Sequence, residues 1–221
     1  MAKTVLVTGA SGFLASYVIA EFFKAGWNQC DADALTYIEP FKDFIDPAVK
    51  GTLRVLEAAK GAGVKRVVVI SSFAAVTNFK EGGPWRDYTY TGADWNPLTV
   101  EDCLVPDVPG PVVYSASKTL ADRAAHDYAA KNDLILCTIN PPVIYGPPLQ
   151  RVASRSEINT SSGAIYALIN GDAEREVPSN RLPLFAHVKD VAVAHAIVHL
   201  SWVHPSLAPR LPKLPPLAHT I

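Results

Sequence analysis

Residues 3–15 read KTVLVTGASGFLA, and this stretch decides the fold. Residues 4–7 are aliphatic or β-branched, as in the buried strands of parallel sheets. Gly9 permits a tight turn, Gly12 lets the backbone approach a phosphate, and Ala15 lets the following helix pack closely. Because a strand, a glycine turn and a helix present backbone N–H groups to an anion, the stretch predicts pyrophosphate binding. The alternative is an ordinary strand-to-helix turn, and the motifs downstream distinguish the two.

The composition fits one large domain with a core, since 49% of the 221 residues are hydrophobic and 19% are charged. A net charge of −1 indicates neither nucleic acid nor an anionic membrane as a partner. Cys30, Cys103 and Cys137 lie far apart without metal-ligand spacing, which indicates a reduced compartment. A strand from residue 3 or 4 leaves no room for a signal peptide, and no apolar run reaches the about 18 residues of a membrane span. We therefore expect a cytoplasmic protein.

Strands and helices alternate, which predicts an α/β fold with a Rossmann-like, doubly wound parallel sheet. The runs VKRVVVI at 64–70 and LILCTI at 134–139 have the composition of buried parallel strands. We expect four or five strands, with the first strand and these two at the centre. Prolines between 140 and 148 argue against helix or strand there. The other expected elements are helices at 12–25, 48–60 (capped by Asp46), 114–131, 161–170 and 190–202 (capped by Asp190), and a short strand at 184–188.

The segment after the first helix departs from a complete fold of this type. Residues 27–45 read WNQCDADALTYIEPFKDFI, in which only 27–30 could form a strand, and its polar residues fit one poorly. Asp31 or Asp33 lies about 20 residues past the glycines, where a ribose-binding acid is expected. The alternative is that both are solvated loop acids. We therefore expect strands to be missing after the first helix.

A serine pair and a tyrosine–lysine helix indicate the chemistry. Ser71 and Ser72 follow the strand at 64–70, and ligands bind at the carboxyl ends of strands in open α/β sheets. Tyr114 and Lys118 lie one helical turn apart on one face. An ordinary tyrosine ionises at a pH of about 10, and a lysine cation beside it favours the phenolate. The serine hydroxyl can donate to a substrate oxygen while the tyrosine exchanges the proton, and a nicotinamide cofactor exchanges the hydride.

Six stretches, covering well over half of the chain, resemble one known family in their order. The family is that of the extended short-chain dehydrogenases/reductases, in the NAD-dependent epimerase/dehydratase branch that includes dihydroflavonol reductases, cinnamoyl-CoA reductases and yeast-type ketone or methylglyoxal reductases. The stretches are VTGASGFLASYVI (7–19), DPAVKGTLRVLEAAKGAGVKRVVVISSFAAV (46–76), YTGADWNPLT (90–99), VVYSASKTLADRAA (112–125), NPPVIYGPP (140–148) and FAHVKDVAVAH (185–195).

The resemblance implies roles for named residues. Ser72 would be the catalytic serine, with Ser71 as the neighbour that could take its place. Tyr114 would be the acid/base and Lys118 its partner. NADP is the implied cofactor, with NAD as the other candidate. The implied cofactor-binding residues are Gly9, Ser11, Gly12, Phe13 and Leu14 at the pyrophosphate, and Tyr114, Lys118, Pro141 and Val143 on the nicotinamide side.

The chain also departs from the family pattern. Residues 26–45 replace three strands and their crossovers, although one crossover alone needs about a dozen residues. Gly92 stands where the family has glutamate, and the proline-rich tail after Trp202 is unlike the family's ending. We therefore expect an NAD(P)-binding core at 1–147, shortened around 26–45, and a reduced substrate-side segment at 148–221.

The expected function is that of an NAD(P)-dependent oxidoreductase, which reduces a ketone or aldehyde to an alcohol. The alternatives are a nucleotide-sugar epimerase or dehydratase and a truncated, non-catalytic remnant. The expected partner is a small-molecule carbonyl compound, and the family's pairing through the tyrosine–lysine helix implies a homodimer. We expect no metal site, although His195 and His199 share a helix face. The aromatic residues within 73–112 either line an apolar substrate pocket or pack the loop.

Overall fold

The computed structural model describes residues 4–9, 12–26, 28–32, 44–149, 152, 154–155, 158–172, 174–177 and 182–203. The predictions for Ser11, Asp33 and the proline-rich tail lie outside these residues. The elements are β1 (Thr4–Thr8), α1 (Phe13–Lys24), β2 (Asn28–Ala32), α2 (Ile45–Gly61), β3 (Arg66–Ile70), η1 (Phe73–Ala75), η2 (Phe79–Glu81), η3 (Gly83–Trp85), η4 (Glu101–Cys103), α3 (Gly110–Lys131), β4 (Ile135–Ile139), β5 (Val143–Tyr145), α4 (Thr160–Ile169), β6 (Phe185–His187) and α5 (Val188–Val203).

The described strands form three parallel pairs: β1 with β2, β3 with β4, and β5 with β6. β2 shows that the polar segment after the first helix does form a strand, because its backbone bonds to β1 along five residues. The prediction that 140–148 contains no strand is wrong, since β5 pairs with β6. The prolines of that segment flank β5 rather than interrupt it, so its three N–H groups are available.

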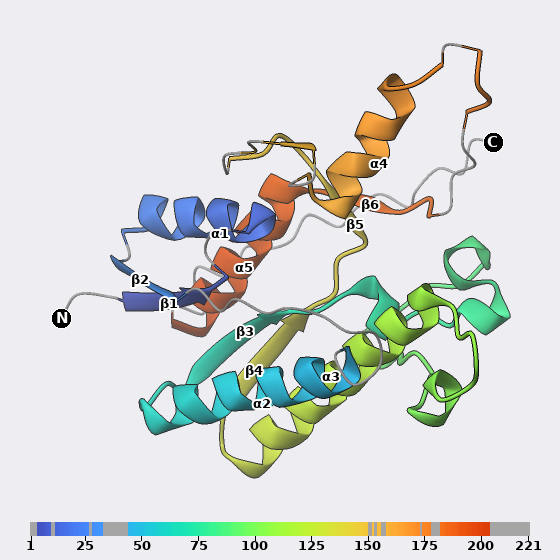
Figure 1. The fold of residues 1–221 in the computed structure, drawn as a ribbon. Coiled ribbons are helices and arrows are strands. Elements are labelled where there is room, and N and C mark those ends of the chain that lie inside the picture. The colour runs from blue at the N-terminus through green and yellow to red at the C-terminus, as the bar shows by residue number, and fades with distance from the viewer. Residues whose placement is uncertain are drawn as a thin grey trace.

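Parallel strands with intervening helices confirm the predicted fold class, but the sheet differs from the expected one. Among the described strands, β1 pairs with β2 and not with β3. Figure 1 shows α5 running from α1 toward β3, and it contacts both. Val188 and Ala192 of α5 are fully buried in a cluster with Tyr17 and Phe22 of α1. Helix α5 therefore packs between α1, which follows β1, and the β3–β4 pair.

Helices α2 and α3 pack against each other beside the β3–β4 pair (Figure 1). Leu56 of α2 is fully buried against Ala125 and Ala129 of α3, whose short side chains let the two helices approach closely. A second cluster fixes the first turns of α3 against α2 and the 98–103 segment; it consists of Ile45, Leu98, Cys103, Val113 and Ala116. The helix that carries Tyr114 and Lys118 is thus packed at both ends.

The helix starts correct two predictions. Helix α2 begins at Ile45, so Asp46 lies in its first turn and binds Lys50 one turn later instead of capping the helix. Helix α5 begins at Val188, and the ring of His187 accepts the Lys189 N–H at 3.2 Å. Asp190, the predicted cap, therefore lies in the first turn, where a carboxylate favours the helix dipole. In the part of the chain that the structure describes, no helix has both the length and the apolar character to cross a membrane.

Candidate active site

The candidate site lies at the carboxyl ends of β3 and β4. Their register places Ile70 beside Ile139, and the pairing continues beyond both strands. The Ser71 N–H donates to the Ile139 carbonyl at 2.8 Å, and the Phe73 N–H donates to the Pro141 carbonyl at 2.9 Å. Ser71 and Ser72 therefore lie beside Asn140 and Pro141, as expected for two strands that end at one sheet edge.

The Ser72 hydroxyl is held by its own backbone turn. Ser72 is extended, at φ −155° and ψ 150°, and its Oγ accepts the Ala74 N–H at 3.2 Å at the start of η1. A hydroxyl has one proton and two acceptor lone pairs. Because Oγ already accepts from the protein, its proton can be directed at a ligand oxygen. This arrangement suits Ser72 for the donor role expected of it.

Tyr114 and Lys118 project from the same side of α3. The Lys118 Nζ lies 5.7 Å from the centroid of the Tyr114 ring, within the range of a cation–π contact. Tyr114 is 43% exposed, so its side chain is not enclosed by the packing around α3. Lys118 and Ser71 line one small hollow of about 100 Å³, and α3 packs against η1. The structure thus brings the lysine helix to the serine pair at the end of β3.

The glycine turn has the predicted backbone geometry. Gly9 has φ +66°, in the left-handed region that favours glycine. The Gly12 N–H donates to the Gly9 carbonyl at 2.9 Å, and a Cβ on Gly12 would stand 3.1 Å from that oxygen. The side chains of Phe13 and Leu14 pack on the α1–α5 cluster, so only their backbone can face a phosphate. The Gly12 N–H is taken by Gly9, so the predicted contact with a pyrophosphate would fall to main-chain groups at the start of α1.

Sequence reasoning missed two contacts of the segment that follows β5. The Tyr17 hydroxyl of α1 donates to the Pro147 carbonyl at 2.8 Å. Gly146 lies so close to α5 that a Cβ there would clash with the Val188 side chain. No local pattern reveals either contact, because the partners are more than 40 residues apart in the chain. Together they attach the 140–148 segment to α1 and α5.

The aromatic residues of the 73–112 segment mostly pack the segment itself. Tyr90 stacks edge-on against Phe73 and Tyr88, and its hydroxyl bonds to Thr77 and Gly83.

Asp94 accepts a hydrogen bond from the Tyr88 hydroxyl, and this bond raises the pKa of Tyr88 and lowers the pKa of Asp94. Gly92, where the family has glutamate, has open space around its Cα. The packing interpretation therefore holds for Tyr90, while Trp85 stays largely exposed.

His195 makes an ordinary helix-internal contact. Its Nδ1 lies 2.7 Å from the Val191 carbonyl, and the ring is 6% exposed. Burial lowers the pKa of His195, which keeps the ring neutral. Across the described residues, no three His, Cys, Asp or Glu side chains cluster as metal ligands would.

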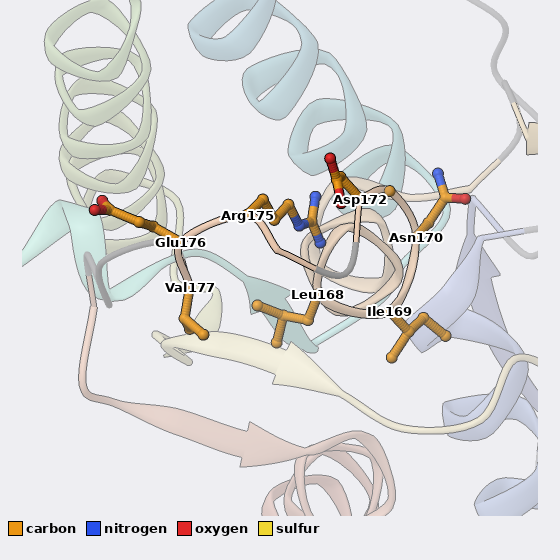
Figure 2. Close-up of a pocket in the computed structure, with 8 residues that line it drawn as sticks. Leu168, Ile169, Asn170, Asp172, Arg175, Glu176 and Val177 are labelled. Atoms are coloured by element: carbon orange, nitrogen blue, oxygen red, sulfur yellow. The ribbon is translucent and has the colours of Figure 1, made fainter.

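A larger hollow of about 390 Å³ lies in the C-terminal segment and shares no lining residue with the candidate site. Figure 2 shows Leu168, Ile169 and Val177 on one side of it, and the polar side chains Arg175 and Asp172 on the other. The Arg175 guanidinium packs against Gly171, and a Cβ on Gly171 would lie 3.0 Å from its Nη1. This hollow belongs to the expected substrate-side segment.

Known proteins resemble this chain in both sequence and fold. Residues 32–204 match the model of the NAD dependent epimerase/dehydratase family. A protein named as an oxidoreductase in Schizosaccharomyces pombe is 35% identical over 87% of this chain and 72% of its own length. A Candida albicans protein named as an NADPH-dependent methylglyoxal reductase is 37% identical over 71% of this chain but only 46% of its own length.

The fold is also that of a solved structure. The crystal structure of Gre2 from Candida albicans has a TM-score of 0.78 to this chain and is 25% identical. The match covers 91% of this chain and 75% of that one, so part of the relative has no counterpart in this chain. With a family model matching most of its residues and a relative above 30% identity, this chain belongs to the NAD dependent epimerase/dehydratase family.

Proposed function

We propose that this chain is an NADP-dependent oxidoreductase that reduces the carbonyl group of a small ketone or aldehyde to an alcohol. The observation that carries the proposal is the position of Lys118 Nζ, 5.7 Å from the Tyr114 ring, on a helix packed beside the serine pair. The names of the relatives, an oxidoreductase and an NADPH-dependent methylglyoxal reductase, support the same class. NAD is the second candidate cofactor.

The proposed reaction gives a separate role to each of three side chains. The Ser72 hydroxyl donates a hydrogen bond to the substrate oxygen, since its Oγ is already held by the Ala74 N–H. The Tyr114 hydroxyl gives its proton to that oxygen as the alcohol forms, with the Lys118 cation beside its ring. NADPH supplies the hydride to the carbonyl carbon when it is bound. The proton from Tyr114 and the hydride together account for the two hydrogens gained.

The residues of the glycine turn fit a dinucleotide. A side chain at position 12 would crowd the Gly9 carbonyl, so the turn requires a glycine there, as a dinucleotide-binding turn does. Helix α1 begins directly after Gly12, and its free N–H groups favour negative charge. Gly9, Ser11, Gly12, Phe13 and Leu14 would hold the pyrophosphate, whereas Lys118, Pro141 and Val143 would face the nicotinamide side.

The division of the chain follows from these roles. Residues 1–147 would hold the cofactor, and residues 148–221, with the hollow beside α4, would contribute to the substrate side. The pattern of three well-spaced cysteines still favours the cytoplasm. The resemblance to the family also supports a homodimer formed through α3, for which native mass spectrometry is the direct test.

The test is a reductase assay on the purified 221-residue chain with NADPH and methylglyoxal, following nicotinamide absorbance. Tyr114→Phe is the catalytic variant, and Tyr128→Phe on the same helix is the matched control. The proposal predicts turnover that Tyr114→Phe abolishes and Tyr128→Phe retains. Turnover that survives Tyr114→Phe unchanged would remove the tyrosine from the mechanism. Conversion of a nucleotide sugar without net consumption of cofactor would instead favour an epimerase.

A further inference from the structure

The amide of Asn140 joins two elements of the candidate site. Asn140 follows β4 directly, and its Nδ2 donates to the Ser72 carbonyl at 3.2 Å and to Asp122 Oδ2 at 2.8 Å. Both partners are acceptors, so the NH₂ end of the Asn140 amide, which carries two donors, must face them. The Ser72 carbonyl also accepts the Ala75 N–H at 2.9 Å, but that bond is local to η1. Asn140 therefore supplies the bond that ties the serine turn to α3.

Asp122 is an acidic side chain that the fold buries. It lies one turn after Lys118 on α3, is 3% exposed, and lines the same small hollow as Lys118 and Ser71. A buried carboxylate is costly unless it is paired or hydrogen-bonded. His126 Nε2 stands 3.5 Å from Oδ1, at the limit of a hydrogen bond, so the Asn140 amide makes the well-formed contact. Packing alone does not explain why a carboxylate occupies this position.

We propose that Asp122 and Asn140 are positioning residues that tie the Ser72 turn to the helix carrying Tyr114 and Lys118. The inference rests on the proposed function, because the geometry it preserves is that of the Ser72 hydroxyl toward Tyr114. The tie runs from α3 through the Asp122 carboxylate and the Asn140 amide to the Ser72 carbonyl. Proton transfer is sensitive to such alignment, since a displacement of about 1 Å can lower a rate about a hundredfold.

Exchanging the two side chains separates positioning from simple stabilisation. Asp122→Asn keeps an oxygen that accepts from Asn140, so both bonds of the tie survive. Asn140→Asp removes both donated hydrogens and places two carboxylates together. In the double variant, the amide now on α3 donates to the carboxylate now at position 140, which restores the link between α3 and β4. That carboxylate cannot donate to the Ser72 carbonyl, so the link to the serine stays broken.

Steady-state kinetics and thermal melts of the four proteins test the tie. We expect Asn140→Asp and the double variant to lose about ten- to a hundredfold in kcat, with the KM for NADPH changed less than about twofold. The double variant should regain the melting temperature that Asn140→Asp loses, and Asp122→Asn should keep kcat within about threefold of wild type. A double variant with wild-type kcat would overturn the proposal, because the serine link would then be dispensable.

Amide hydrogen exchange tests the tie without turnover. The Ala74 N–H, which donates to Ser72 Oγ, should exchange faster in Asn140→Asp and in the double variant but not in Asp122→Asn. If the wild-type chain reduces no carbonyl compound while these exchange rates differ as expected, the proposed function fails and the tie stands. Equal exchange at Ala74 in all four proteins would overturn the tie itself.

Discussion

Replacing Leu56 by alanine tests the packing that holds the candidate catalytic helix. Leu56 is 0% exposed and packs against Ala125, Ala129 and Leu134. Leucine-to-alanine changes in cores cost about 2–5 kcal/mol, and the cost rises with the cavity that remains. Two of the facing residues are alanines with no rotatable side chain, so they cannot fill the space. We therefore expect Leu56→Ala to lose about 3–4 kcal/mol of unfolding free energy.

Urea unfolding followed by circular dichroism measures this loss. For a chain of this size, each kcal/mol corresponds to about 2–4 °C, so the melting temperature should fall by about 6–16 °C. Val55→Ala on the same helix is the matched control, because Val55 is 45% exposed and should lose less than about 1 kcal/mol. Equal losses in the two variants, or a loss below about 1 kcal/mol for Leu56→Ala, would refute the α2–α3 packing described above.

Three further predictions concern Tyr114, Gly9 and His195. Tyr114→Phe should lower kcat by at least about a hundredfold in the reductase assay. Its melting temperature should match that of the wild-type chain, because the residue is 43% exposed. A lower melting temperature together with the loss of activity would indicate a structural role for Tyr114 instead. Gly9→Val should destabilise the fold by about 1–2 kcal/mol or more, because φ is +66° there, whereas Gly92→Val, with open space and no positive φ, should not. Burial lowers the pKa of His195, so as the pH falls the unfolded chain binds a proton at this histidine before the folded chain does. The contribution of the neutral, buried ring to the unfolding free energy is therefore complete above a pH of about 6.5 and should decline below it. His195→Gln should flatten that decline in urea unfolding at pH 7 and 5, and an unchanged slope would contradict the assignment.

The parts predicted correctly from the sequence depend on local signals. The first strand and the glycine turn lie within one short stretch, and Gly9 and Gly12 have the geometry that their spacing implies. The strand before Ser71 is a continuous apolar run, and the helix from 114 to 131 lies within α3. In each case a pattern within about twenty residues specifies the structure, as minimally frustrated sequences allow.

The parts that the sequence did not reveal depend on tertiary contacts. The residues NQCDA have a weak strand propensity, yet they form β2 because β1 offers a row of backbone partners. Asp122 reads as an ordinary surface charge of a helix, and only the fold shows that it is buried beside Asn140. Asp46 has the sequence signature of a cap, but the helix begins one residue before it and its carboxylate binds Lys50 instead.

The most direct measurement is a titration of the purified 221-residue chain with NADPH and, separately, with NADH, following nicotinamide fluorescence. Gly12→Asp is the control, because its Cβ would stand 3.1 Å from the Gly9 carbonyl oxygen and its negative charge would repel a phosphate. The account predicts saturable binding, tighter for NADPH, that Gly12→Asp abolishes. A folded chain that binds neither cofactor would contradict the claim that it is an NADP-dependent reductase.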